Sequence, residues 1–154
     1  MSAGEMDYTI YYILSGFARS YIDCDDGEER TVYLAGPGMI VASSKTNLGD
    51  KPGNENAVII KNSMLLRADM RKFREAAIKH PNFYRLQTEL MTKNLLEAVE
   101  RVEFHTVLSP EQRYQYLLDN RPDILQNVPL KHIASYIGIT PVSLSRLRSR
   151  MHTR

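Results

Sequence analysis

The segment Leu130–Ser149 constrains the fold of this chain more than any other part of the sequence. Two short stretches with apolar residues at helical spacing flank Gly138, and the second opens on Thr140 and Pro141, which favour the first turn of a helix. Ala134 is small enough for close contact between two helices, and a glycine tolerates the left-handed backbone of a tight turn. The spacing predicts a helix-turn-helix, two helices that cross at a steep angle.

The apolar positions of this segment predict which side chains are buried. Ile133 and Ile137 should face inward from the first helix, and Leu144 and Leu147 from the second. Ile139 should fill the gap between the two helices. Every position that the motif requires therefore holds a suitable residue type. A helical hairpin used only for packing is the alternative, but it has no reason to keep a basic, hydroxyl-rich outer face.

The outward face of the second helix predicts contact with DNA. Pro129–Arg154 holds five Lys and Arg residues and no acidic residue, although the whole chain carries a formal net charge of only +2. Such a local positive field favours phosphate groups. Arg146 is the candidate for bidentate contact with a guanine, and Val142 suits a thymine methyl group. Arg148 and Arg154 are expected to contact phosphate or to stay solvated. The candidate DNA-contacting residues are Lys131, Thr140, Val142, Ser143, Ser145, Arg146, Ser149 and Arg150.

The first part of the chain is predicted to form β-strands. Runs rich in β-branched and aromatic residues alternate there with turn-forming residues. Ser15-Gly16 is expected to end the first strand, Asp25–Glu28 to form a hairpin turn, and Ser43–Asn56 to form a loop. The expected strands are Thr9–Leu14, Phe17–Asp23, Thr31–Leu34, Met39–Ala42, Ala57–Ile60 and Met64–Arg67.

The pattern changes from strand to helix at Asp69. This residue is a suitable N-cap for a helix over Met70–Lys79, and Pro81 can begin a long helix that reaches about Val107. A further helix is expected to follow a capping box that begins at Ser109. The order predicts an α+β chain. Its expected parts are a β domain over residues 1–68, connecting and dimerisation helices over 69–108, and a helix-turn-helix domain over 109–154.

The long helix carries a repeating apolar seam that is typical of a dimer interface. Its positions recur three and four residues apart over nearly three heptads. A long helix between two small domains has little of its own chain to bury against, which favours pairing with a second copy. Packing against its own domain is the alternative. The candidate interface residues are Tyr84, Met91, Leu95, Ala98 and Val102.

Composition argues against several other functions. The single cysteine, Cys24, excludes an internal disulfide and, within one chain, a four-cysteine metal or cluster site. The four histidines are scattered without ligand spacing, so no metal is expected. No nucleophile elbow or phosphate-binding loop is present, so we expect neither an enzyme nor a cofactor. No apolar run is long enough to span a membrane, and a cytoplasmic protein is expected.

Two segments and the helix between them resemble the Crp/Fnr family of bacterial transcription regulators. The segments are YYILSGFARSYID over Tyr11–Asp23 and VPLKHIASYIGITPVSLSRLR over Val128–Arg148. In that family a β-roll sensor, similar to cyclic-nucleotide-binding domains, precedes a long dimerisation helix and a C-terminal helix-turn-helix. The resemblance implies a homodimer on near-palindromic double-stranded DNA. It makes RNA polymerase and an unidentified small-molecule effector candidate partners, and no membrane partner is expected.

Several features differ from the pattern of the family. The residue pairs with which cyclic-nucleotide binders hold the phosphate correspond here to Ala42-Ser43 and Glu55-Asn56, and an acidic residue at this place would repel a cyclic phosphate. Cys24 alone cannot supply an iron–sulfur site. Fewer strands are predicted than a complete roll contains, and no wing hairpin follows Met151, so we expect a partial β-roll. Val142 stands where many relatives have an acidic base-reading residue, so their operator does not carry over.

These observations predict a sequence-specific DNA-binding transcription regulator that cyclic AMP does not control. Residues 140–150 would be the recognition helix in the major groove. The alternative is a sensory or interaction module whose helical tail binds protein. Salt distinguishes the two, because binding to several phosphates weakens steeply as salt rises, whereas an apolar protein contact responds little.

Overall fold

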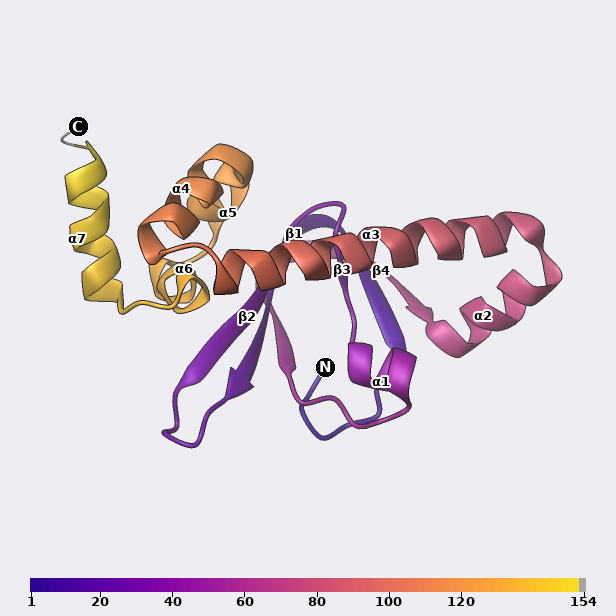
Figure 1. Ribbon diagram of the computed structural model, residues 1–154. Helices are drawn as coiled ribbons and strands as arrows, with labels where there is room; N and C mark the ends of the chain where they lie inside the picture. The colour runs from indigo at the N-terminus through magenta and orange to yellow at the C-terminus, as the bar shows by residue number, and fades with distance from the viewer. Residues whose placement is uncertain (153–154) are drawn as a thin grey trace.

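The computed structural model describes residues 1–152 of the 154-residue chain. Figure 1 shows a four-stranded antiparallel sheet beside a long helix, with α2 at one end of this helix and the C-terminal helices at the other. The predicted α+β class, with a sheet followed by a long helix and a helical C-terminal part, is confirmed. The elements are β1 Thr9–Asp23, β2 Glu29–Ala35, β3 Ile40–Val41, α1 Ser44–Gly49, β4 Asn56–Asp69, α2 Met70–Lys79, α3 Pro81–Thr106, α4 Pro110–Asn120, α5 Pro122–Asn127, α6 Leu130–Ile137 and α7 Pro141–His152.

β1 is the central strand of the sheet. It pairs with β4 along one edge, and with β2 and then β3 along the other, always antiparallel. The strands expected at Ala57–Ile60 and Met64–Arg67 are parts of the single strand β4. The hairpin turn between β1 and β2 lies where Asp-Gly predicts it, and the N–H of Gly27 donates to the carbonyl oxygen of Cys24 at 2.9 Å.

The expectation that Ser15-Gly16 ends the first strand is wrong. β1 continues through both residues, and its pairing with β4 shifts there as in a β-bulge. Gly16 has a φ of +88°, and a Cβ at this position would lie 2.0 Å from Oγ of Ser63. This Oγ accepts a hydrogen bond from the N–H of Phe17 at 3.1 Å. The glycine therefore bends the strand around a neighbouring side chain and does not end it.

The expected loop Ser43–Asn56 contains a short helix, α1. Oγ of Ser43 accepts from the N–H of Thr46 at 3.3 Å and caps the helix, which ends at Asp50 in a left-handed conformation. Oγ1 of Thr46 donates to the carbonyl oxygen of Lys51 at 2.8 Å. These polar residues look like loop residues in the sequence, but they hold the helix together by bonding with one another.

The helices after the sheet begin where their caps predict. Oδ1 of Asp69 accepts from the N–H of Arg71 at 2.8 Å at the start of α2. In the capping box of α4, Oγ of Ser109 accepts from the N–H of Gln112 at 3.3 Å, and the N–H of Ser109 donates to Oε1 of Gln112 at 2.8 Å. The short helix α5, which Pro122 opens, lies where the sequence predicts no helix.

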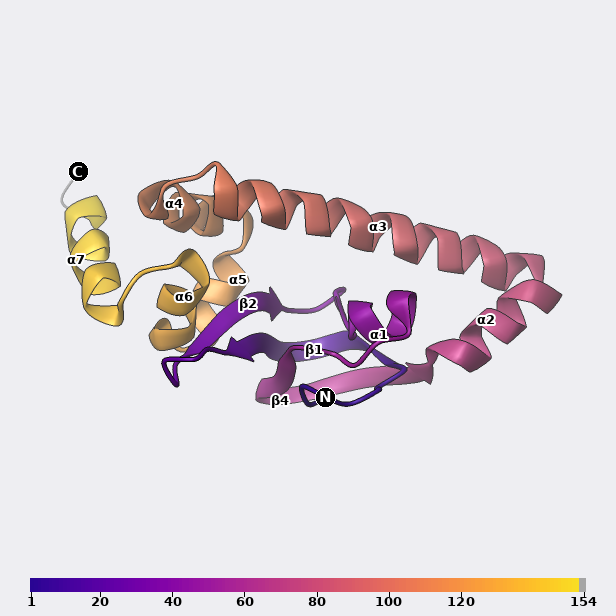
Figure 2. The same ribbon diagram turned by 60° about the horizontal axis from the view of Figure 1, so that its bottom comes forward.

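One apolar core joins the sheet to the C-terminal helices. Phe17 and Leu34 of the sheet pack with Phe104 of α3 and with buried residues of α4 to α7. α6 lies against β2 (Figure 2), where Oγ of Ser135 accepts a hydrogen bond from the N–H of Thr31 at 2.9 Å. The helix-turn-helix is therefore packed directly onto the sheet.

Candidate DNA-binding surface

α6 and α7 form the helix-turn-helix that the sequence predicts. α6 ends at Gly138, which has a φ of +81° and so adopts the left-handed conformation. The N–H of Ile139 donates to the carbonyl oxygen of Ala134 at 3.0 Å and closes the turn. Oγ1 of Thr140 accepts from the N–H of Ser143 at 3.2 Å and caps α7. Local hydrogen bonds thus fix the angle between the two helices.

The side chains expected to face inward are buried. Ile133 and Ile137 are fully enclosed on α6, and on α7 the exposed fraction is 1% for Leu144 and 4% for Leu147. Ile139 is partly buried and packs against the same core. Because both leucines of α7 point into the protein, the opposite face of this helix is held toward solvent.

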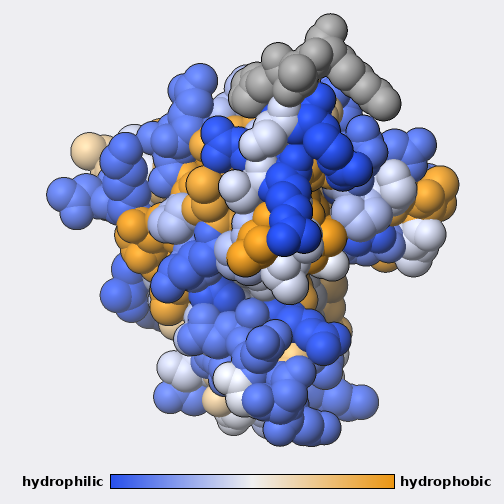
Figure 3. Space-filling view, turned by 90° about the vertical axis from the view of Figure 1, so that its left-hand side faces the viewer, coloured by the Kyte–Doolittle hydropathy of each residue, from blue (hydrophilic) through white to orange (hydrophobic). Residues whose placement is uncertain are grey.

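The outer surface of the helix-turn-helix holds all eight candidate DNA-contacting residues in exposed positions. Figure 3 views this end of the molecule, where a band of strongly hydrophilic side chains crosses the middle of the surface. Within residues 1–152, no ion pair engages Arg146 or Arg150. The surface is therefore cationic, and no ion pair within the described residues neutralises these two arginines. Its exposed residues are Lys131, Thr140, Val142, Ser143, Ser145, Arg146, Ser149 and Arg150.

The other two arginines of this segment differ from Arg146 and Arg150. Arg148 is half-buried, and its Nε is shielded from solvent without a hydrogen-bond partner among the described residues. Arg154 lies outside the described residues. The cations that the described surface offers are therefore Lys131, Arg146 and Arg150.

Arg113 on α4 connects the helix-turn-helix to the end of α3, a role that the sequence does not suggest. Its Nη1 donates to the carbonyl oxygen of Ile137 at 3.0 Å. Its Nε and Nη2 donate to the carbonyl oxygens of Phe104 at 3.0 Å and His105 at 2.5 Å. The last carbonyl groups of a helix have no partner within that helix. One guanidinium therefore satisfies the ends of two helices.

The candidate dimer residues on α3 divide between its two sides. The exposed fraction is 65% for Leu95 and 62% for Val102, and Tyr84 is exposed as well. Met91 and Ala98 are partly buried and line a cavity that also reaches Leu95. The outward side of α3 thus carries an apolar stripe, which we define as Leu95, Leu96, Val99 and Val102.

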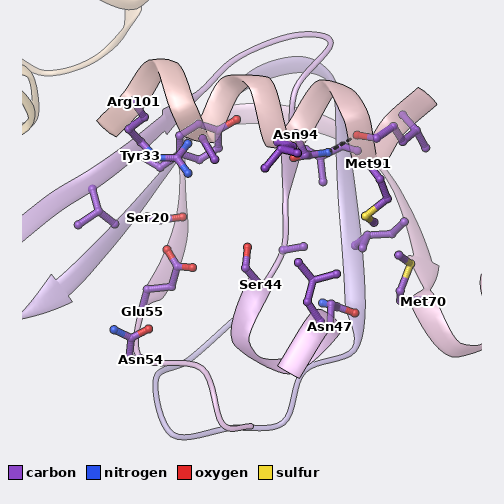
Figure 4. Close-up of a pocket in the computed structure, with 18 of the residues that line it drawn as sticks. Ser20, Tyr33, Ser44, Asn47, Asn54, Glu55, Met70, Met91, Asn94 and Arg101 are labelled. Carbon is purple, nitrogen blue, oxygen red and sulfur yellow. Dashed lines mark hydrogen bonds between the residues drawn. The ribbon is translucent and has the colours of Figure 1, made fainter. Parts of the chain in front are cut away.

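A cavity of about 670 Å³ lies between α3 and the sheet (Figure 4). Glu55 lines it, and burial raises the pKa of this carboxyl group, while Arg101 and Lys45 nearby oppose the rise. Ser43, which corresponds to a phosphate-holding position in the resemblance, uses its Oγ within the chain to donate to Oγ1 of Thr46 at 3.0 Å.

The part of the chain that the structure describes contains neither a candidate metal site nor a candidate membrane-spanning helix. No group of His, Cys, Asp and Glu side chains there is placed to hold a metal ion. None of the described helices combines the length and the apolar character needed to cross a bilayer.

The sequence matches no protein-family model and no curated protein. Solved structures, in contrast, match nearly the whole chain. FixK2 from Bradyrhizobium japonicum superposes with a TM-score of 0.76 and 20% identity over 98% of this chain and 79% of that one. The global regulator CLP from Xanthomonas campestris gives a TM-score of 0.70 and 15% identity over 99% of this chain and 81% of that one.

A third similar structure is a protein from Eubacterium rectale assigned to the Crp/Fnr family of transcriptional regulators. It matches with a TM-score of 0.67 and 17% identity over 98% of this chain and 73% of that one. At such identities the likeness concerns the fold. The chain has the fold of the Crp/Fnr regulators over nearly its whole length.

Proposed function

We propose that this chain is a sequence-specific, DNA-binding transcription regulator that acts as a homodimer. The observation that carries the proposal is the two-sided character of α7. Leu144 and Leu147 are buried, whereas Ser145 and Arg146 face solvent on a surface without acidic residues. A helix held in this way can enter the major groove, which is wide enough for an α-helix.

Each group on this surface has a role in the proposed complex. The fork of donors on Arg146 reads a guanine through O6 and N7, and Val142 near the start of α7 meets a thymine methyl group. Lys131 and Arg150 contact phosphate groups and position the helix without reading sequence. The hydroxyl groups of Thr140, Ser143, Ser145 and Ser149 suit phosphate oxygens and base edges.

The apolar stripe of α3 supports the homodimer. Four apolar side chains on one exposed face are costly for a monomer, and two α3 helices side by side would bury them. In such a dimer each α7 helix would bind one half-site of the DNA. The two half-sites would lie about one turn of the duplex apart, roughly 34 Å. Tyr84 would join this interface at the start of the helix, and Met91 and Ala98 would support it from the cavity side.

Cyclic AMP is not the signal in this proposal. A cyclic phosphate needs a cation and free donors, but Glu55 contributes an acidic side chain to the cavity, and the guanidinium of Arg101, the one cation among its described lining residues, lies over the ring of Tyr33. The Oγ of Ser43 is already bonded to Thr46. Cyclic AMP at millimolar concentration should therefore leave the affinity for DNA unchanged.

The test is a selection of bound sequences from random duplexes with the full-length protein. We expect a near-palindromic site to be enriched. Replacing Arg146 with Ala should weaken binding to that site by about 1–3 kcal/mol, the usual worth of a bidentate base contact. Arg67→Ala, which removes an exposed arginine from β4, is the control and should bind as the wild type does. Failure to enrich any sequence, or wild-type affinity in Arg146→Ala, contradicts the proposal.

A further inference from the structure

The edge of β2 that has no strand partner lies against α6, and the side chain of Ser135 bonds the two together. β2 pairs with β1 on one side only. On the other side, Oγ of Ser135 accepts from the N–H of Thr31 at 2.9 Å and donates to the carbonyl oxygen of Glu29 at 3.3 Å. One hydroxyl group of the helix-turn-helix thus makes the pair of backbone contacts that a further strand would make at this place.

Arg19 on β1 holds the same two residues of β2 by their side chains. Its Nε donates to Oγ1 of Thr31 at 2.8 Å, and its Nη1 donates to Oε2 of Glu29 at 2.6 Å in an ion pair. Arg19 is only 3% exposed, and its guanidinium lies over the ring of Tyr21, 4.4 Å from the ring centre. Charge-assisted hydrogen bonds of this kind are stronger than neutral ones. The sheet therefore holds in place the backbone groups that Ser135 contacts.

Apolar packing fixes the position of α6 along β2 less sharply than these bonds do. Ile133, Ala134 and Ile137 of α6 are buried in the core that the sheet shares. The hydrophobic effect is non-directional, so such a contact tolerates small shifts and rotations. Hydrogen bonds, in contrast, weaken steeply as their angles change. The two bonds of Ser135 therefore define one register of α6 on the sheet.

Arg113 supplies a second fixed point, at the end of α6. It joins the carbonyl oxygen of Ile137, the last residue of α6, to the carbonyl oxygens at the end of α3. One anchor would leave α6 free to pivot, whereas two anchors set its direction. Because α3 carries the apolar stripe of the proposed dimer, a fixed α6 also fixes α7 relative to that interface.

We propose that Ser135 is a positioning residue for DNA binding, which sets the distance between the two α7 helices of the homodimer. Ser135 acts through α6, which carries α7 with it, and does not itself contact the duplex. The protein then selects the spacing between two half-sites as well as their sequence. This inference rests on the proposed function, because it requires a homodimer on two half-sites. The contact of Ser135 with β2 does not rest on it, and can be measured without DNA.

Hydrogen–deuterium exchange of the Thr31 amide, followed by NMR, tests the contact in the free full-length protein. Ser135→Ala removes the acceptor of this N–H, so we expect the amide to exchange at least about threefold faster. Ser135→Thr keeps a hydroxyl group and should exchange as the wild type does. Asp69→Ala removes the cap of α2, at the other end of α3 (Figure 1), and is the control for lost stability. Its effect on the Thr31 amide should be smaller.

Duplexes with altered spacing test the role in DNA binding. In the duplex that the selection enriches, one base pair is inserted or removed between the half-sites, which moves one of them by about 3.4 Å. The wild type should prefer the selected spacing by at least about tenfold, and Ser135→Ala by about threefold or less, because its α7 helices can adjust. Ser135→Thr should restore the wild-type preference. Asp69→Ala should keep it as well, because a loss of folded protein lowers binding to every duplex by the same factor.

A change of one base within a half-site should weaken Ser135→Ala and the wild type equally, because α7 itself is intact in the variant. A tenfold spacing preference in Ser135→Ala overturns the proposal, as does a relaxed preference that Asp69→Ala shares. Unchanged exchange of the Thr31 amide in Ser135→Ala also overturns it. Tighter binding of Ser135→Ala to the selected duplex does so too, because the contact would then hold the helix-turn-helix away from DNA.

The two kinds of failure are distinguishable. If the wild type enriches no duplex, the proposed function fails, and this inference fails with it. If the wild type enriches a site with two half-sites whose spacing preference does not depend on Ser135, only this inference fails.

Discussion

At Gly138 a single residue controls the angle between α6 and α7. Its φ of +81° lies in the left-handed region, and an added Cβ would lie 3.1 Å from Nη1 of Arg113. We expect Gly138→Ala to lower the free energy of unfolding by about 1–2 kcal/mol, the usual cost of this conformation for a residue with a side chain. Gly49→Ala, which meets nothing within 4 Å, should change it by less than about 0.5 kcal/mol. Urea denaturation that gives equal effects would refute this role of Gly138.

His105 makes the stability of the helical part depend on pH. Its ring lies 5.0 Å from that of Phe104 and 5.2 Å from that of Tyr136. Burial, with the charges of Arg113 and Arg101 nearby, holds its pKa below the usual 6.5. The unfolded chain therefore binds this proton more readily, so the free energy of unfolding should fall as the pH drops below about 6.5.

The variant His105→Gln isolates this contribution. Urea denaturation at a series of pH values between about 7.5 and 5.5 should give a shallower pH dependence than in the wild type. Some dependence should remain, because burial and Arg19 also lower the pKa of His132. An unchanged slope in His105→Gln would contradict the assignment.

At the level of elements, Arg113 holds two helix ends together. Replacing it with Met keeps much of the side-chain stem but removes the three hydrogen bonds to α3 and α6. We expect Arg113→Met to lower the free energy of unfolding by about 2–3 kcal/mol, because charged donors to partly buried carbonyl groups are lost. Arg85→Met breaks only an exposed pair with Glu89, and should cost about 0.5 kcal/mol or less. A loss in Arg113→Met as small as this would show that the carbonyl groups find other partners.

The elements that the sequence predicts well are those whose signals are local. The capping residues of α2, α4 and α7 bond to atoms two or three residues away, so their order in the chain is enough to place them. The bulge at Gly16 depends instead on Ser63, and the contact of Ser135 with Thr31 joins residues 104 positions apart. Such contacts between distant residues form only in the folded sheet, and no local sequence pattern predicts them.

At the level of the whole molecule, the exposed stripe of α3 predicts a dimer. Val102 does not line the cavity, so Val102→Glu adds charge to the proposed interface without changing the pocket. We expect this variant, and also Leu95→Glu, to be monomeric by light scattering. Leu66→Glu adds the same charge to an exposed position of β4 and should keep the mass of the wild type. If Val102→Glu also keeps that mass, the stripe is not the interface.

The DNA-binding surface and the cavity between α3 and the sheet differ in how far the sequence predicts them. The DNA-binding surface lies on one continuous segment, so helical spacing alone places Leu144 inward and Arg146 outward. The cavity is assembled from the sheet, α1, α2 and α3, and its lining residues Asn47 and Glu55 fall in a segment that reads as a loop. The sequence indicates an acidic residue near the phosphate position, but the cavity that Glu55 lines becomes visible only in the folded chain.

The most direct test of the DNA-binding surface is the salt dependence of binding to the selected duplex, measured by fluorescence anisotropy with the full-length protein. The logarithm of the association constant should fall linearly with the logarithm of the salt concentration, by about 0.9 for each phosphate contacted. Arg150→Ala should reduce the size of this slope by about 1, because one phosphate contact is lost. An association constant that stays the same across the salt range would contradict the account, since a helix in a DNA groove must displace counterions.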